Sequence, residues 1–401
     1  MIGYSGGMDN VTARVAAQYT AYSYPEAFAD LDVRMKAGHV DFGDPAYFGP
    51  MFWPEGRSTP PRILVAGCGT VQASVIAYSN PDSQVVGIDI SDASLGHQRY
   101  LRETFGLKNL ELYQGDLRDV GKIGGTFDLI VSTGVLHHMA DPASGLSALK
   151  SVLSPDGAMF IMLYASIGRA GVYLVQDALR RMGVSQTPED VAFVRALLDK
   201  LPPGHPVQWY RSCATDLSYD AGIVDTFLHP QDRAYDVSQI MDWVKGVGLG
   251  FQSWMENARY EPYAHLPDIA SRLEALPDED RWAAVEALLG TAMRHMFILR
   301  HPDRVHRVSF EGDDYLAYRP RAFPDASVGV QDGQRLIIRG SAGFPVSEAE
   351  TLVFPWCDGS RTIAAMEADP VLAGYDPAER RAFLKEHFQR MWRVGLMMFQ
   401  R

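Results

Sequence analysis

Short apolar runs alternate with amphipathic stretches between residues 62 and 164. An apolar run of about four to eight residues bounded by turn residues is typical of a buried strand, and apolar positions three or four residues apart are typical of a helix. The pattern predicts strands at 62–66, 85–90, 110–114, 127–132 and 158–164. It predicts helices at 11–19, 72–78, 93–105 and 144–153, and a turn at 154–157. Such alternation indicates a parallel sheet that helices cover on both faces.

The pattern changes twice after residue 164. From 168 to about 246 it is mostly helical, and strands follow at 250–254 and 294–300 with a helix at 281–289 between them. These strands would complete a seven-stranded, Rossmann-like α/β sheet. Beyond residue 301, strand-like pieces at 305–310 and 335–339 precede helices at 347–354 and 377–394. We therefore expect an N-terminal lid or helical segment (1–61), an α/β domain (62–303, with a helical insertion at 168–246) and a small α+β winged-helix-like domain (304–401).

Composition and charge narrow the class of protein. Of the 401 residues, 47% are hydrophobic, which excludes a wholly disordered chain. With 49 acidic and 37 basic side chains, the net charge of −12 disfavours a broad electrostatic grip on nucleic acid. From residue 305 onward there are 12 basic and 13 acidic side chains, which disfavours a basic DNA-recognition helix. We expect no nucleic-acid partner.

The sequence predicts a cytoplasmic protein. No apolar run approaches the roughly 20 residues that span a bilayer, and residues 1–15 lack the basic and apolar regions of a signal peptide. Cys68, Cys213 and Cys357 are odd in number and far apart, so they form neither a disulfide framework nor a zinc motif. We expect reduced thiols, no metal and no membrane partner.

A glycine turn with two acids indicates a pocket for adenosine. Gly67 and Gly69 directly follow the first strand, where glycines let backbone amides approach a ligand at a helix N-terminus. Asp89 ends the second strand 22 residues after Gly67, in the right place to accept both ribose hydroxyls. Asp116 ends the third strand, where its carboxylate can accept from an adenine amino group.

The cofactor that fits this pocket carries no phosphate. A dinucleotide fingerprint requires a third glycine three residues after the second, where the pyrophosphate passes, and this chain has Gln72 there. The acidic pocket also lacks a basic residue for phosphates, whereas a positively charged sulfonium tolerates it. S-adenosyl-L-methionine is therefore favoured over NAD.

Residues 62–164 resemble the core of class I S-adenosylmethionine-dependent methyltransferases. The resemblance is carried by Val65-Ala-Gly-Cys-Gly-Thr70, Gly87-Ile-Asp89, Gly115-Asp-Leu117, Phe127-Asp-Leu-Ile130 and Leu153-Ser-Pro-Asp-Gly157. The pocket and the resemblance together predict a set of cofactor-binding residues: Tyr19, Ala66, Gly67, Cys68, Gly69, Gln72, Asp89, Ile90, Asp116, Leu117, Thr133 and Gly134. One residue departs from the family pattern, because Val71 stands where the family usually has glycine and can crowd the methionine end of the cofactor.

A narrower resemblance extends to about residue 303. Ala17-Gln-Tyr19 with Tyr24-Pro25, Ser132-Thr-Gly-Val-Leu-His-His-Met139 and Asp225-Thr-Phe-Leu-His-Pro230 are similar to one bacterial subgroup. That subgroup includes methyltransferases fused to tetratricopeptide repeats and rickettsial outer-membrane-protein lysine methyltransferases. The likeness implies that the acceptor is a lysine or another nucleophile on a peptide, or a small metabolite.

Three histidines are candidates for acid–base or orienting roles. His137 and His138 follow the fourth strand, where the acceptor should meet the methyl group. His229 lies in the inserted region with Tyr210 and Arg211, and this region would cap the acceptor site. Each of these side chains can instead be structural, and water alone can serve as the base. The ring of Tyr19 can pack against the sulfonium by a cation–π contact.

The last part of the chain carries a second resemblance. Val346-Ser-Glu-Ala-Glu-Thr-Leu-Val353 and Trp356-Cys-Asp-Gly-Ser-Arg-Thr-Ile363 look like the winged-helix peptide chaperone of pyrroloquinoline-quinone biosynthesis. Domains of that kind hold a peptide as an added strand at a sheet edge. A unit that only packs on the core, or that forms a homodimer, is the alternative.

The function predicted from the sequence is transfer of a methyl group from S-adenosylmethionine to a nitrogen or oxygen nucleophile. The acceptor would be a peptide, a protein or a small metabolite. Two alternatives stay open: a non-catalytic module that binds S-adenosylmethionine or a peptide, and an NAD-dependent oxidoreductase, which Gln72 disfavours.

Overall fold

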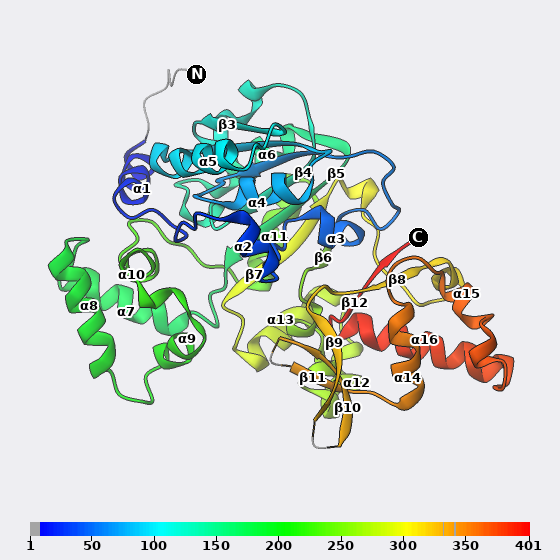
Figure 1. The fold of residues 1–401 in the computed structure, drawn as a ribbon. Coiled ribbons are helices and arrows are strands. Elements are labelled where there is room, and N and C mark those ends of the chain that lie inside the picture. The colour runs from blue at the N-terminus through cyan, green and yellow to red at the C-terminus, as the bar shows by residue number, and fades with distance from the viewer. Residues whose placement is uncertain (1–8, 332, 341) are drawn as a thin grey trace.

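The computed structural model describes residues 9–331, 333–340 and 342–401. The first eight residues, which belong to the predicted N-terminal segment and to the stretch tested for a signal peptide, lie outside this part. Figure 1 shows a central sheet with helices on both faces, a group of green helices to one side and an orange-to-red C-terminal unit below. No helix in the described part of the chain combines the length and the apolar character needed to cross a membrane.

The central sheet has seven strands in the order β3-β2-β1-β4-β5-β7-β6. Its strands are β1 (Arg62–Ala66), β2 (Gln84–Asp89), β3 (Leu110–Gln114), β4 (Phe127–Thr133), β5 (Leu153–Tyr164), β6 (Gly250–Trp254) and β7 (Arg294–Arg300). The first five run parallel, and β7 is antiparallel to both of its neighbours. The predicted Rossmann-like sheet is confirmed.

The turn predicted at 154–157 is wrong. Residues 154–157 lie within β5, because Phe127 of β4 pairs with Leu153 and Leu129 already pairs with Ala158. The ladder therefore continues on both sides of the segment, while Pro155 and Asp156 bulge outward into solvent. The turn residues interrupt the register without ending the strand.

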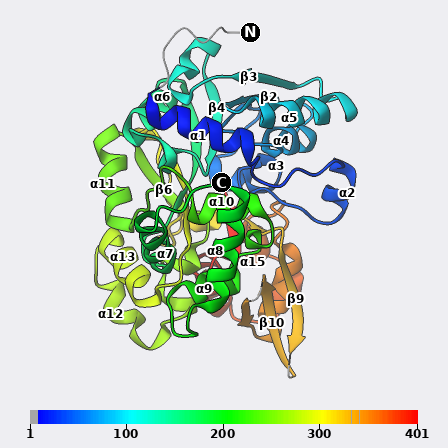
Figure 2. The same cartoon turned by 90° about the vertical axis from the view of Figure 1, so that its left-hand side faces the viewer.

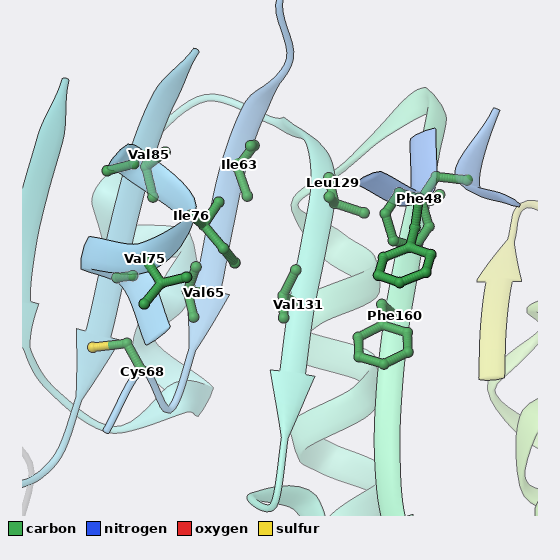
Figure 3. Close-up of a cluster of buried hydrophobic side chains, with 14 of the residues drawn as sticks. Phe48, Ile63, Val65, Cys68, Val75, Ile76, Val85, Leu129, Val131 and Phe160 are labelled. Atoms are coloured by element: carbon green, nitrogen blue, oxygen red, sulfur yellow. The ribbon is translucent and has the colours of Figure 1, made fainter. Parts of the chain in front are cut away.

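The strands bury both faces because their side chains alternate between two apolar clusters. Ile63 and Val65 point to one side, and Leu64 and Ala66 point to the other. Figure 3 shows the first side, with the strand residues facing Val75 and Ile76 of α4. Burying an aliphatic side chain of this size contributes about 1.5–3 kcal/mol. Near-continuous apolar strands are thus the pattern expected for a doubly covered sheet.

Different helices cover the two faces. The first face carries α2 (Leu31–Lys36), α3 (Pro45–Phe52), α4 (Gln72–Ser79) and α5 (Asp92–Thr104), with α1 (Asn10–Ala21) beside α5. The second carries α6 (Pro142–Ser151), α11 (Val237–Val247) and α13 (Asp278–Leu289), and the short α12 (Ala270–Glu274) lies next to α13.

The helical insertion has an apolar cluster of its own. It consists of α7 (Ala170–Arg181), α8 (Pro188–Lys200), α9 (Val207–Cys213) and α10 (Asp220–Phe227). Val172, Val175 and Leu179 follow the helical period along α7 and form its buried stripe. In Figure 2 these green helices face the viewer, below α1.

The C-terminal unit combines small sheets with three helices. Its elements are β8 (Arg319–Ala322), β9 (Ala326–Gln331), β10 (Gln334–Arg339), β11 (Ala342–Pro345), α14 (Glu348–Val353), α15 (Ile363–Glu367), α16 (Pro377–Arg393) and β12 (Met397–Gln400). Strands β11, β10 and β9 form one antiparallel sheet, and β12 pairs with β8.

The strand predicted at 305–310 is wrong. Its backbone pairs with no strand, and the His306 amide instead donates to the carboxamide oxygen of Gln252 at 3.4 Å. Phe310 packs into the C-terminal apolar cluster, so the apolar positions serve side-chain packing rather than a ladder.

Candidate active site

A cavity of about 730 Å³ lies at the carboxyl ends of the parallel strands. Residues that follow β1, β2, β3 and β4 line it, together with residues of the N-terminal segment and of the helical insertion. The strand order reverses between β1 and β4, and ligands of open α/β sheets bind at such a point.

The glycine turn after β1 forms one wall of the cavity. Gly67 and Gly69 have positive φ angles of 77° and 52°, which side chains disfavour. A Cβ atom on Gly67 would lie 2.1 Å from Cγ2 of Val135. The carboxamide of Gln98 donates to the carbonyls of Cys68 and Gly69 at 3.0 and 3.1 Å, so α5 holds the turn in place.

Asp89 joins the glycine turn to the end of β2. Its Oδ2 accepts from the Gly69 amide and its Oδ1 from the Ser91 amide, both at 2.8 Å. Burial raises the pKa of the Asp89 carboxyl, and the backbone hydrogen bonds partly offset this increase. The carboxylate is therefore fixed in position at the cavity wall.

Asp116 is fixed in a different way. Its Oδ1 accepts from the Arg118 amide and Nε at 2.8 and 2.9 Å, and its Oδ2 accepts from Nη2 at 2.6 Å. The same guanidinium pairs with Asp9 at 3.0 Å, which ties α1 to this end of the cavity. Oδ2 of Asp116 retains acceptor capacity for a further donor.

Gln72 and Thr133 connect the glycine turn to β4. The Gln72 carboxamide accepts from the Thr133 hydroxyl at 2.8 Å and donates to Asp41 at 3.0 Å. Burial raises the pKa of the Asp41 carboxyl. Asp41 thus adds a third acid to this wall of the cavity.

A carboxylate with two phenol donors lies at the opposite end of the cavity. Asp225 of α10 accepts from the hydroxyls of Tyr19 and Tyr164, each at 2.9 Å. Burial, assisted by the Asp225 charge, raises the pKa of both phenols well above the usual value, so both donate as neutral groups. Tyr24 likewise donates to Asp216 at 3.0 Å.

Three histidines lie beside this carboxylate. The rings of His138 and His229 stack with centroids 3.8 Å apart, and Nδ1 of His138 lies 2.9 Å from the Gln231 carbonyl. Nδ1 of His229 accepts from the Gln231 amide at 3.1 Å. His137 is fully buried, and burial lowers the pKa of both His137 and His229 well below the usual value. Both are therefore neutral near pH 7.

Two groups within the described residues have ligand atoms close enough for a metal ion: His137, His138 and Asp232, and His138, Asp225 and His229. Two features of their surroundings disfavour a metal ion. Arg169 lies 3.9 Å from Asp232 and would repel a cation, and Nδ1 of His229 already accepts a backbone proton.

The sequences of known proteins match parts of this chain. Residues 61–191 match a family model described as a methyltransferase domain. An uncharacterised protein of Synechococcus is 30% identical over 299 residues, which cover 70% of this chain and 69% of the relative. A ubiquinone biosynthesis O-methyltransferase of Acinetobacter baylyi is 29% identical over 101 residues, or 25% of this chain and 42% of the relative.

A solved structure shares the fold of nearly the whole chain. PKMT2 from Rickettsia typhi superposes with a TM-score of 0.68 at 16% identity and covers 94% of this chain and 77% of its own. Its complex with AdoHcy gives a TM-score of 0.66 at 16% identity and covers 90% of this chain and 76% of its own.

The chain belongs to the class I S-adenosylmethionine-dependent methyltransferases.

The methyltransferase has the donor set that this cofactor requires. The glycine turn with Asp89 suits a ribose, and Asp116 suits an adenine amino group. When bound, S-adenosylmethionine supplies an electrophilic methyl group. The protein's own residues orient both partners and exclude water from the space between them.

Most of the predicted residues converge on the cavity of the methyltransferase. Its lining includes Tyr19, Gly67, Cys68, Gly69, Gln72, Asp89, Ile90, Asp116, Leu117, Thr133, Gly134 and His138. Ala66, His137 and His229 are buried outside the lining. Tyr210 also lines the cavity, whereas Arg211 pairs with Asp199.

The expectation of a pocket without basic residues is wrong for the cavity as a whole. Arg34, Arg169, Arg259 and Arg294 line it, all contributed by segments other than the glycine turn.

Val71 does not require the conformation of glycine. Its φ of −141° lies outside the left-handed region that favours glycine, and α4 begins at the next residue. The side chain is 9% exposed and belongs to the apolar cluster of the sheet, although it also borders the cavity.

Sequence reasoning missed Asp225, Tyr164, Asp41 and Gln98 as contributors to the site. Asp225 stands in the motif at 225–230, and Tyr164 ends the fifth predicted strand, so both had a signal. Asp41 and Gln98 had none, because only the folded chain brings them to the glycine turn.

Proposed function

We propose that this methyltransferase modifies a nitrogen or oxygen nucleophile on a peptide or protein, with a small metabolite as the second candidate. The shape of the cavity carries this proposal. Its lining includes the glycine turn and Asp225, and also Cys213 and Arg259. An acceptor at Asp225 can continue as a chain toward the Cys213 and Arg259 end.

The far end of the cavity lies beside the C-terminal unit. Asn257, two residues before Arg259, donates its carboxamide to the Trp392 carbonyl of α16 at 3.2 Å. We assign 304–401 to a winged-helix-like domain that presents the edges of the β9–β11 sheet to a peptide, as an added strand. We also propose domain boundaries at residues 61 and 303 and a cytoplasmic location.

We assign cofactor binding to the eleven lining residues named above other than His138, and an acid–base or orienting role to His138. The contact of its Nδ1 with the Gln231 carbonyl supports a proton on that atom and a free lone pair on Nε2. The rings of His229 and His137 pack against the ring of His138, with centroids 3.8 and 4.2 Å away, and hold it in position.

Labelling of a size-fractionated extract tests this function. The protein is incubated with methyl-labelled S-adenosylmethionine and a bacterial lysate divided at about 3 kDa, and the label is counted in both fractions. We expect label in the large fraction and much less label with the Asp89→Asn variant. Label confined to the small fraction identifies a metabolite acceptor, and no label in either fraction contradicts the proposal.

A further inference from the structure

Asp225 is a buried carboxylate whose hydrogen-bond donors are both neutral. It is 2% exposed, and the Tyr19 and Tyr164 hydroxyls donate to its two oxygens. The ion pairs found among the described residues do not include it, and Arg169 pairs with Asp232 instead. Phenols orient a carboxylate but leave its charge uncompensated. Such a group favours a cationic ligand.

The position of Asp225 places that charge where the acceptor should bind. Tyr164 ends β5, two residues after Met162, which pairs with Thr133 of β4 and accepts from the Gly134 amide at 3.4 Å. The glycine turn follows the neighbouring strand β1 and lines the same cavity. Asp225 thus lies at the end of β5 and lines the same cavity as the glycine turn.

Neighbouring groups reinforce the preference for a cation. A ring nitrogen of His138 and one of His229 lie within 4.8 Å of an Asp225 oxygen, and His229 is neutral because burial lowers its pKa. Tyr19, Tyr24 and Tyr164 present aromatic rings to the cavity, and ring faces attract ammonium groups. The acceptor end therefore combines the Asp225 and Asp216 carboxylates with aromatic walls, and the Arg169 guanidinium packs over the Tyr164 ring at 3.7 Å.

We propose that Asp225 is a specificity-determining residue that binds the ammonium form of the acceptor, so that the methyltransferase selects an amine over a hydroxyl or a thiol. This inference rests on the proposed function, because it assigns the acceptor atom of the same site. A neutral hydroxyl would donate a hydrogen bond to the carboxylate, whereas an ammonium donates one and also neutralises the negative charge.

Sinefungin tests the charge without a known acceptor, because it carries an amine where S-adenosylmethionine carries the transferable methyl group. Its affinity and that of S-adenosylhomocysteine are measured by calorimetry on the wild type and on Asp225→Asn. We expect the wild type to bind sinefungin about tenfold more tightly than S-adenosylhomocysteine. In Asp225→Asn this preference should vanish while the affinity for S-adenosylhomocysteine stays the same, which also shows that the variant is folded.

Two further variants isolate the role of the charge. Asp220→Asn removes an exposed acid from the same helix, where it pairs with Arg195, and should keep the wild-type preference. Tyr164→Phe removes one donor but keeps the carboxylate, so it should retain most of the preference. Equal affinities for the two ligands in the wild type, or a preference that survives in Asp225→Asn, would overturn the assignment.

The labelled product provides an independent check. A methyl group on nitrogen survives alkaline hydrolysis, whereas a methyl ester releases methanol. Label recovered as an N-methylated amine after acid hydrolysis supports the amine assignment, whereas label in a methyl ester, ether or thioether overturns it while leaving peptide methylation intact. Absence of any labelled product contradicts the proposed function, and the sinefungin comparison still decides the role of Asp225.

Discussion

Single residues in this methyltransferase act through conformation as much as through chemistry. Asp89 holds the glycine turn by accepting from the Gly69 and Ser91 amides, and it has lone pairs left for a ribose. Gly67 is required because its backbone has a positive φ and its Cβ position lies against Val135. Both features depend on direct contacts in the folded protein, and both support the wall of the cavity that binds the cofactor.

Replacing Asp89 by Asn should weaken binding of S-adenosylhomocysteine about 10- to 100-fold, because charge-assisted hydrogen bonds to the ribose become neutral ones. Titration calorimetry measures the change. Asp82→Asn, in the exposed loop before β2, is the matched control and should bind like the wild type. Unchanged affinity in Asp89→Asn would show that Asp89 does not hold the ribose.

The variants Gly67→Ala and Gly106→Ala distinguish backbone strain from a steric clash of the added Cβ atom. Both glycines have positive φ, but only at Gly67 would a Cβ meet another atom within 4 Å. Gly106→Ala should cost about 1 kcal/mol of unfolding free energy and leave cofactor affinity intact. Gly67→Ala should cost more and abolish binding of S-adenosylhomocysteine. Denaturant titration and calorimetry give the two readouts, and equal behaviour of the two variants would refute the collision with Val135.

At the scale of elements, many helices begin at a capping side chain that the sequence shows directly. Asp9, Asp30, Asp44, Ser91 and Asp141 each accept from backbone amides of the first turn of a helix. Asp44 differs from the others because packing buries it completely at the start of α3. Burial raises the pKa of Asp44 to about 6, although hydrogen bonds from Asn80 and the Ala46 amide oppose this.

This elevated pKa predicts a pH dependence of stability. Between about pH 4 and 6 the folded protein holds the Asp44 proton more tightly than the unfolded chain does, so the contribution of Asp44 to the free energy of unfolding falls as the pH rises. The loss reaches up to about 3 kcal/mol above pH 6. Asp44→Asn should remove this slope in urea titrations across the window. Asp30→Asn changes an exposed cap and should keep it, and a wild-type slope in Asp44→Asn would contradict the prediction.

At the scale of the whole molecule, the N-terminal segment connects the sheet to the C-terminal unit. Phe48 of α3 packs against Phe323 with ring centroids 5.9 Å apart, and the Arg401 amide donates to the Pro54 carbonyl at 2.6 Å. Phe323 and Met398 belong to the same apolar cluster as the strands of the sheet. The C-terminal unit is therefore packed into the main core.

Phe323→Ala should cost about 3–5 kcal/mol, because it opens a cavity in this shared cluster. We also expect the single calorimetric transition of the wild type to separate into two, since the mutation removes the ring that couples the parts. Leu352→Ala, at a half-exposed position of α14, should leave both the midpoint and the shape of the transition nearly unchanged. Two transitions in the wild type would show that the cluster does not couple them.

The sequence by itself determined the sheet, the glycine turn and the acids at the ends of β2 and β3. These are local features: a strand buried on both faces must be apolar along its length, and a tight turn needs glycine where φ is positive. Local pattern failed at 305–310 and missed β8 and β12, because a strand exists only when a partner completes its ladder. The tertiary structure alone decided the acceptor end. Tyr19 and Asp225 are 206 positions apart, and no periodicity encodes the contact that makes this carboxylate a recognition site.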